Sequence, residues 1–492
     1  MKLMLSHKAR LPWGSAILSA IAALCAPHAS AATPASAAQY SIINLGPDAG
    51  LTVLNRQGQV AFSTWSPEGI HNGFFDGQRL HVLGSLGGNY TAVRGLNDRG
   101  VVVGQSADAA FNYRAFSWTV AGGMRPLTGP GVSDANAVNN GRQVAGLVGT
   151  PAGYARANRW NADGSLVSLG PLPARISTAW AINDSGVSVG DSEVALYDSR
   201  AMVWDVAGNA TDLGKFGGTQ STAKHINAAG QVLGTYYKDG RGIGFLWSPK
   251  GGAVLIGPDS GDQYVTALNE NGEVSGNNLA VDGSPGFRYR PFFWSAQRGM
   301  RALPVAGALD ARVNALNGLR DMVGFVTRAP DDPHSRRATL WSDMAGPVDL
   351  NRRLYKAPAG LLLYAATAIN DDGAIVAESN AGLVLLRPGR TGTAAPVLGP
   401  VSGGAADDTV ALNATLDLTV GFVDSDAAES HTASASVNDS CPQAAPSLRE
   451  RLGLGDVSLR HTFCQAGTFT VKVKVTDRAG NATQVQRRLV VN

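Results

Sequence analysis

One segment of the chain matches a catalytic pattern, the five residues Gly186 to Gly190 with Ser188 at their centre. In hydrolases the G-x-S-x-G pattern places a nucleophilic serine on a turn from a strand to a helix. Here the segment belongs to a repeated unit, and the other copies hold valine, methionine or isoleucine at the position of Ser188. An inward-facing strand position explains this pattern, so we do not predict Ser188 to be a nucleophile.

Three aspartates near the C-terminus could supply hard oxygen ligands to Ca²⁺, namely Asp424, Asp426 and Asp477. The alternative is that these residues only form turns. The histidines are scattered, and the chain contains no H-E-x-x-H, C-x-x-C or phosphate-loop pattern. Calcium is therefore the one cofactor that the sequence suggests, and none is required.

The chain has three cysteines, Cys25, Cys441 and Cys464. Cys25 falls in an N-terminal segment that reads as a secretory signal, with Lys2, Lys8 and Arg10 before a short apolar run and small residues near Ala31. Cleavage near Ala31 leaves an even number of cysteines in an exported chain, which predicts a disulfide between Cys441 and Cys464. Two free, buried thiols are the alternative.

The predicted mature chain is electrically balanced. Residues 1–31 carry three basic residues and no acidic ones, which leaves 38 of each kind in the remainder. This balance argues against a general nucleic-acid partner or an anionic membrane surface. Beyond the signal no apolar run is long enough to span a bilayer, so we expect a secreted or periplasmic protein, and a monomer.

A repeated unit organises the middle of the chain. Asn97 begins a turn and has Gly104 seven residues later, and counterparts of this asparagine recur 42 to 53 residues apart. A tryptophan, Trp118, follows 21 residues after Asn97 and also recurs. Within the unit, alternation and turn residues predict four short strands, which is the length and content of a β-propeller blade. The counterparts of Asn97 are Asn55, Asn139, Asn183, Asn227, Asn269, Asn317 and Asn370.

The two ends of the repeat complement each other. A spare strand, Tyr40 to Leu45, precedes the first copy, and the eighth copy stops after its third strand. Pairing between them would close a ring and remove its exposed sheet edges. We therefore predict an all-β protein with an eight-bladed propeller, or a seven-bladed one if the degenerate last copy is not a blade.

The repeat resembles the HAF-repeat extracellular proteins of bacteria, through Leu83–Gly88, Ile182–Gly190 and Arg114–Trp118. It departs from them at Arg114 and Arg200, where the family has histidine. The resemblance implies export and a β-rich repeat fold, and no established chemistry. After a linker, 389–406, the region 407–492 resembles a PKD-type, immunoglobulin-like sandwich. The predicted domains are a signal peptide (1–31), a short linker (32–39), the propeller (40–388), the second linker and the sandwich.

Variable loops on a rigid scaffold are the usual place for recognition. The loops after the second strands carry aromatic and guanidinium groups that suit a glycan, a matrix or a protein surface. We therefore predict a non-catalytic binding, adhesion or interaction protein, and as the alternative a polysaccharide-degrading enzyme that uses Asp108, Glu193, Asp239 and Asp332. The predicted ligand contacts are Phe111, Tyr113, Tyr236, Tyr237, Phe287, Tyr289, Arg290 and Arg328.

Overall fold

The computed structural model describes residues 40–492, apart from 47–48, 67–68, 151, 171–175, 258–261, 280–287, 330–331, 333–334, 343–345, 356, 389–394, 404–407, 425–430, 452–453 and 478–479. The predicted signal peptide and the short linker after it lie outside these residues. Nothing in the described part of the chain is a helix long and apolar enough to cross a membrane.

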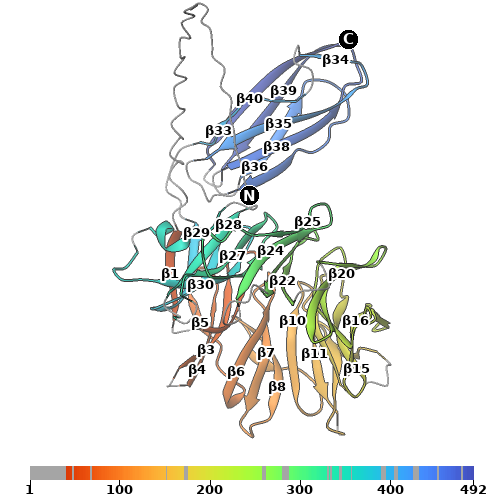
Figure 1. Ribbon diagram of the computed structural model, residues 1–492, viewed down its shortest axis with the longest axis vertical. Coiled ribbons are helices and arrows are strands. Elements are labelled where there is room, and N and C mark those ends of the chain that lie inside the picture. Colours follow the sequence, from red (N-terminus) through yellow and green to blue (C-terminus); the bar gives the residue numbers. More distant parts are fainter. Residues whose placement is uncertain are drawn as a thin grey trace, which may run out of the picture. The chain divides into compact units, whose positions relative to one another are not determined.

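The described residues form ten four-stranded sheets, eight of them within 40–388 (Figure 1). Seven of the eight use four strands in chain order, each antiparallel to the next, as the repeat predicts. The first four of these sheets are β2 (Ala49–Leu54), β3 (Val60–Ser66), β4 (Gly69–Phe75) and β5 (Leu80–Val82); β6 (Gly87–Leu96), β7 (Val102–Asp108), β8 (Tyr113–Thr119) and β9 (Gly123–Pro126); β10 (Ser133–Val138), β11 (Val144–Gly149), β12 (Ala155–Trp160) and β13 (Leu166–Ser168); and β14 (Ser177–Ile182), β15 (Ser188–Ala195), β16 (Asp198–Trp204) and β17 (Ala210–Asp212).

The next three sheets follow the same plan, and the last of them leads into a short 3-10 helix, η2 (Leu350–Arg353). Their strands are β18 (Gln220–Ile226), β19 (Val232–Lys238), β20 (Arg241–Ser248) and β21 (Gly252–Leu255); β22 (Gln263–Leu268), β23 (Val274–Leu279), β24 (Tyr289–Ser295) and β25 (Gly299–Ala302); and β26 (Asp310–Leu316), β27 (Asp321–Thr327), β28 (Arg336–Ser342) and β29 (Val348–Asp349).

The eighth sheet joins the two ends of the repeat. It consists of β30 (Leu363–Ile369), β31 (Ile375–Ser379), β32 (Gly382–Pro388) and, at its edge, β1 (Tyr40–Gly46). β1 runs antiparallel to β32, with Tyr40 opposite Pro388 and Asn44 opposite Val384. The spare N-terminal strand thus pairs with the truncated last copy.

The recurring asparagines form a cycle of hydrogen bonds. The side-chain Oδ1 of Asn97 accepts from the backbone N–H of Val101 at 2.9 Å, which fixes the turn between β6 and β7. Its Nδ2 donates to the carbonyl oxygen of Asn139, the next asparagine, at 2.8 Å. The same donation occurs at every copy, and Asn370 returns it to Asn55 at 3.0 Å. A residue that shapes a local turn therefore also ties each sheet to its neighbour.

The recurring glycines permit close packing within each sheet. A Cβ on Gly104, Gly146, Gly190 or Gly324 would lie 1.9 to 2.0 Å from a carbonyl oxygen of the preceding strand. This distance is a severe clash, so no larger residue fits there without moving backbone. Three of the recurring tryptophans, Trp160, Trp204 and Trp341, are almost completely buried.

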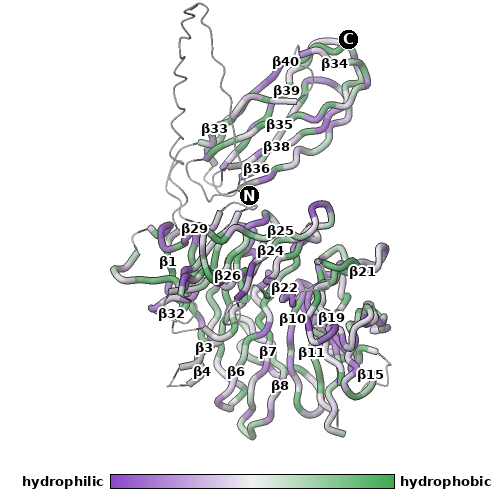
Figure 2. Tube along the Cα trace, in the orientation of Figure 1, coloured by the Kyte–Doolittle hydropathy of each residue, from purple (hydrophilic) through white to green (hydrophobic). Residues whose placement is uncertain are grey.

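The C-terminal part, described by itself, is a sandwich of two sheets. One contains β33 (Val397–Leu398), β35 (Thr415–Val423), β38 (Leu454–Thr462) and β37 (Ser447–Arg451); the other contains β34 (Thr409–Val410), β40 (Ala482–Val491), β39 (Gly467–Thr476) and β36 (Thr432–Val437). Buried and exposed residues alternate along β35 and β39, and Figure 2 shows the matching alternation of hydropathy. The inward residues form one core cluster that includes Phe422, Phe463 and Val473.

Candidate functional site

The strongest candidate site is a cavity of about 690 Å³ at one edge of the sheet β26–β29. Four segments line it: the turn before β26, the end of β27, the start of β28, and β29 with η2. Ordinary ligand pockets measure roughly 300–1,000 Å³, so the cavity has room for a small molecule or a peptide end. Its walls are formed by Val305, Ala306, Ala308, Val326, Arg328, Ser335, Arg337, Thr339, Pro347, Val348, Asp349, Arg352 and Arg353.

Four of the lining residues are arginines, and one is an aspartate. The carboxylate of Asp349 caps η2, where its Oδ1 accepts from the backbone N–H of Asn351 at 3.0 Å and from its Nδ2 at 2.9 Å. Arg337 donates to the carbonyl oxygen of Arg336 at 2.7 Å. The cavity therefore has a surplus of positive charge, and its one carboxylate is already engaged in a local turn.

Three of these guanidinium groups have no acceptor in the described part of the chain. Arg328, Arg352 and Arg353 make no hydrogen bond or ion pair there, although Arg353 lies near enough to Tyr40 to influence it electrostatically. Unpaired cations that share one cavity repel each other, and an anion placed among them would relieve that repulsion. Guanidinium groups bind carboxylates and phosphates through two parallel hydrogen bonds.

The hydroxyl groups at the cavity do not form a catalytic pair. The Oγ of Ser335 lies 2.5 Å from the Oγ1 of Thr327 and 2.7 Å from the carbonyl oxygen of Ala329. Its proton is therefore directed at oxygen atoms of its own loop, and none of these partners is a general base. The cavity is equipped to hold an anion, and its geometry assigns no bond-breaking step to Ser335.

The structure separates the ligand contacts predicted from the sequence. Arg328 lines the cavity, whereas Phe111, Tyr113 and Tyr237 are exposed elsewhere on the sheets. Tyr289 packs edge-on against Tyr264 at 5.4 Å and stacks with Arg312, and Arg290 donates to the carbonyl oxygen of Leu309 at 2.7 Å. Phe287 lies outside the described residues.

The predicted role of Tyr236 as a ligand contact is wrong. It is 1% exposed and packs against Phe216 in a core cluster. β19 continues through Lys238, so Tyr236 and Tyr237 alternate between the two faces of a strand and do not both lie in a loop. The ring of Tyr236 stabilises the sheets and is not available to a ligand.

Three of the carboxylates predicted for catalysis or calcium have other partners. Asp108 accepts from the backbone N–H of Asn112, and this hydrogen bond lowers the pKa of Asp108. Asp424 lies 2.8 Å from the Nε2 of His431, and Asp477 accepts from Asn481 within a turn. Asp426 lies outside the described residues, so the calcium site stays a prediction.

The sequence reasoning missed a ring of residues on the first strands. The residue three positions before each recurring asparagine ranges from threonine and asparagine to Arg94, Trp180 and Lys224, and from Arg94 through Thr367 it sits at a β-bulge. The Nζ of Lys224 lies 3.3 Å from the ring centre of Trp180, whose Nε1 donates to Asp191. Burial lowers the pKa of Lys224, partly opposed by Asp191. The repeat alignment could have found these residues, because they vary where their neighbours do not.

No family model matches the chain, and no curated protein matches it. Solved structures do. A puromycin-hydrolyzing peptidase of Mycobacterium tuberculosis has 11% identity and a TM-score of 0.42, over 79% of this chain and 57% of that one. The dipeptidyl peptidase 4 of Porphyromonas gingivalis has 10% identity and a TM-score of 0.42, over 67% and 57%. A putative TolB from Agrobacterium tumefaciens has 13% identity and a TM-score of 0.33, over 46% and 83%.

At these identities the likeness is one of fold, and it is a likeness to propeller-like proteins. The chain spans less than two thirds of the length of the peptidase structures that it matches. The neighbours with a named activity are peptidases. This finding contradicts both functions predicted from the sequence, the adhesion or binding protein and the polysaccharide-degrading enzyme.

Proposed function

We propose that the protein serves peptide processing and that the arginine-lined cavity holds a peptide by its C-terminal carboxylate. One observation carries the proposal: Arg328, Arg352 and Arg353 line one cavity and have no acceptor within the described residues. A carboxylate would supply the missing negative charge. The proposal concerns how a substrate is held, and it assigns no hydrolytic residue to this chain.

The remaining walls favour a peptide over a simple inorganic anion. Val305, Val326 and Val348 border the same cavity as the arginines. A C-terminal residue with an aliphatic side chain presents a carboxylate and an apolar group side by side, so it fits both kinds of wall. Phosphate or sulfate would engage the arginines but would leave the apolar wall exposed to water.

The scaffold of this proposal is an eight-bladed β-propeller closed by β1, followed by an immunoglobulin-like sandwich. Eight sheets within 40–388 and the asparagine cycle that returns to Asn55 support it. The sequence resemblance to HAF-repeat and PKD-type proteins, and export to the periplasm or the medium, belong to the same proposal.

Isothermal titration with an N-acetylated tripeptide ending in leucine tests the function. Its free acid carries one charge, the C-terminal carboxylate, and its C-terminal amide carries none. We expect the acid to bind at least about tenfold more tightly than the amide, because a hydrogen bond to a charged group contributes about 1.5–3 kcal/mol. Arg328→Gln and Arg352→Gln should each weaken binding of the acid by about tenfold or more.

Arg99→Gln is the matched control, since Arg99 is exposed and lies in the turn before β7, away from the cavity. It should leave the affinity unchanged. Equal binding of the acid and the amide would refute the proposal. So would binding of inorganic phosphate that competes fully with the peptide at the same concentration, because the apolar wall would then contribute nothing.

A further inference from the structure

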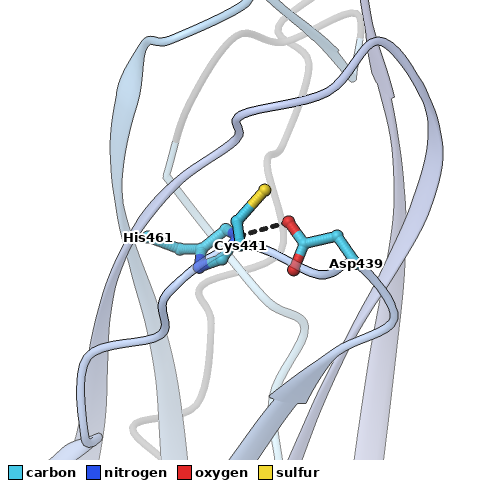
Figure 3. Close-up of side chains that lie close together, drawn as sticks. All are labelled: Asp439, Cys441 and His461. Atoms are coloured by element: carbon cyan, nitrogen blue, oxygen red, sulfur yellow. Dashed lines mark hydrogen bonds and ion pairs between the residues drawn. The ribbon is translucent and has the colours of Figure 1, made fainter.

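A second group of reactive side chains lies in the sandwich, where Asp439, Cys441 and His461 converge (Figure 3). Asp439 and Cys441 come from the segment after β36, and His461 comes from β38. The ligating atoms of the three residues all lie within 4.8 Å of one another. The Nε2 of His461 is 2.7 Å from the Oδ2 of Asp439, and Figure 3 shows the sulfur of Cys441 on the same side.

The histidine and the aspartate of the cluster are shielded from solvent. The side chains of His461 and Asp439 are 0% and 2% exposed. The ring of Phe463 stands edge-on to the ring of His461, with 4.7 Å between their centres. The Nδ1 of His461 is buried and has no hydrogen-bond partner among the described residues. An imidazole nitrogen, a thiolate sulfur and a carboxylate oxygen are the ligands that Zn²⁺ prefers in proteins, and a dry site strengthens each bond.

One of these ligands is blocked. The sulfur of Cys441 is bonded to that of Cys464, with 2.07 Å between the two atoms. A disulfide sulfur carries no negative charge, whereas the thiolate is the form that binds a metal. The oxidised chain therefore presents two zinc ligands in a cluster that has the geometry for three.

We propose that reduction of the Cys441–Cys464 disulfide opens a zinc site formed by Cys441, His461 and Asp439. A phosphine supplies the electrons in the test below: it attacks the S–S bond and is oxidised to its oxide with an oxygen atom from water, and the two thiols take up the two protons. When the metal binds, the thiol of Cys441 releases its proton to the solvent.

A backbone hydrogen bond is directed at the sulfur of Cys441, the proposed metal ligand. The backbone N–H of Cys464 donates to the sulfur of Cys441 at 2.9 Å. An N–H directed at sulfur stabilises the negative charge of a thiolate and tunes a metal–sulfur bond. The fourth position of a tetrahedral site is left to water or to the thiol of Cys464, which the reduction releases beside it.

Cobalt titration of the full chain tests the proposal, because a thiolate bound to Co²⁺ gives a charge-transfer band in the near ultraviolet. The oxidised chain should give no band. After treatment with tris(2-carboxyethyl)phosphine and its removal without air, one equivalent of Co²⁺ should produce the band, and one equivalent of Zn²⁺ should abolish it. Asp439→Asn, which keeps the size of the buried side chain, should weaken cobalt binding by at least about tenfold.

Two cysteine variants separate the redox step from the metal site. Cys464→Ser cannot form the disulfide and should bind Co²⁺ without any phosphine, whereas Cys441→Ser should bind at least about 100-fold more weakly. The control is His431→Gln in the second histidine–aspartate pair of the sandwich, where Asp424 is 2.8 Å from the Nε2 of His431. After the same reduction, this variant should bind Co²⁺ as tightly as the reduced wild-type chain does.

Circular dichroism of each variant verifies that the sandwich is folded, so that absence of a band in a folded protein is informative. A band of equal strength in the oxidised chain would overturn the proposal. The same holds for absence of a band in folded Cys464→Ser, or for equal affinities of the two cysteine variants.

Discussion

The eight sheets of 40–388 and the sandwich are stabilised in different ways. In the sheets, apolar contacts are divided among eight separate core clusters of the described residues, and buried asparagines link each sheet to the next. In the sandwich one cluster holds both sheets, with one disulfide beside it. A repeated unit spreads its stabilisation, whereas the sandwich concentrates it. We therefore expect single substitutions to cost most in the sandwich.

The contrast extends to chemistry. The repeat uses its buried asparagines for structure, because each one has a partner in the neighbouring copy. The sandwich has no second copy to supply partners, and in the part of it that the structure describes the Nδ1 of His461 has none. The two proposed sites lie where the repeat is interrupted or absent. The arginine cavity lies at the longest interval between recurring asparagines, and the Cys441 cluster lies outside the repeat.

The largest expected effect is that of Phe463→Ala in the sandwich. Phe463 is 0% exposed and belongs to the single core cluster. Its truncation should lower the free energy of unfolding of that part by about 3–5 kcal/mol, because the cavity left behind cannot be filled by a second core. Chemical denaturation followed by circular dichroism measures the change. The control Phe111→Ala removes a ring that is 66% exposed and should change stability by less than about 0.5 kcal/mol.

Asn183→Ala should have a smaller effect, of about 2–3 kcal/mol, in the repeat. The side chain is 7% exposed, accepts from the backbone N–H of Val187 at 3.1 Å and donates to the carbonyl oxygen of Asn227 at 3.1 Å. Its loss leaves the half-buried backbone N–H of Val187 without this acceptor, at a cost of about 1–3 kcal/mol. The carbonyl oxygen of Asn227 keeps the N–H of Gly230, so there only the link between the two copies is lost, at a cost of about 1 kcal/mol. The same denaturation experiment applies.

Asn112→Ala is the control for this substitution, since the exposed amide of Asn112 bonds to Asp108 in a surface turn. A loss for Asn183→Ala that exceeds the loss for Phe463→Ala would invert the comparison. It would mean that the cycle of asparagines, rather than apolar packing, dominates the stability of the chain.

The smallest expected effect depends on pH and belongs to His225 in β18. Burial and the neighbouring Lys224 lower the pKa of His225 to about 4, from an ordinary value of 6.5. Between these two values the unfolded chain binds a proton that the folded chain does not, so stability falls as the pH drops from about 6.5 towards 4. We expect a loss of about 1–2 kcal/mol between pH 7 and pH 5.

Thermal denaturation of the wild type and of His225→Gln across this pH range measures the contribution. The difference between the two proteins should vary with pH, because glutamine does not titrate. A difference that stays constant from pH 7 to pH 5 would contradict the prediction and would mean that His225 is as readily protonated in the folded chain as in the unfolded one.

Much of the fold could be predicted because the repeat is local. For the copy at Asn97 the repeat predicts four short strands, and the structure has them as β6, β7, β8 and β9. Turn chemistry and alternation act over a few residues, so a single sequence contains them. The face of a strand on which a side chain lies is also set by local alternation, but only for residues that belong to the strand. The sequence prediction assigns Tyr236 to a loop, but β19 continues through Lys238 and includes it.

The sequence by itself determined the repeated unit, and it predicted the strand N-terminal to it that completes the last sheet and the cysteine pair. Each depends on spacing or on counting. Only the tertiary structure decided which distant residues meet. Two strands, β28 and β29, lie between Arg328 and the helix that contains Arg353, and one strand, β37, lies between Asp439 and the strand that contains His461. Each pair nevertheless shares a site. No pattern along the chain records such meetings, because they follow from how strands pair and sheets pack.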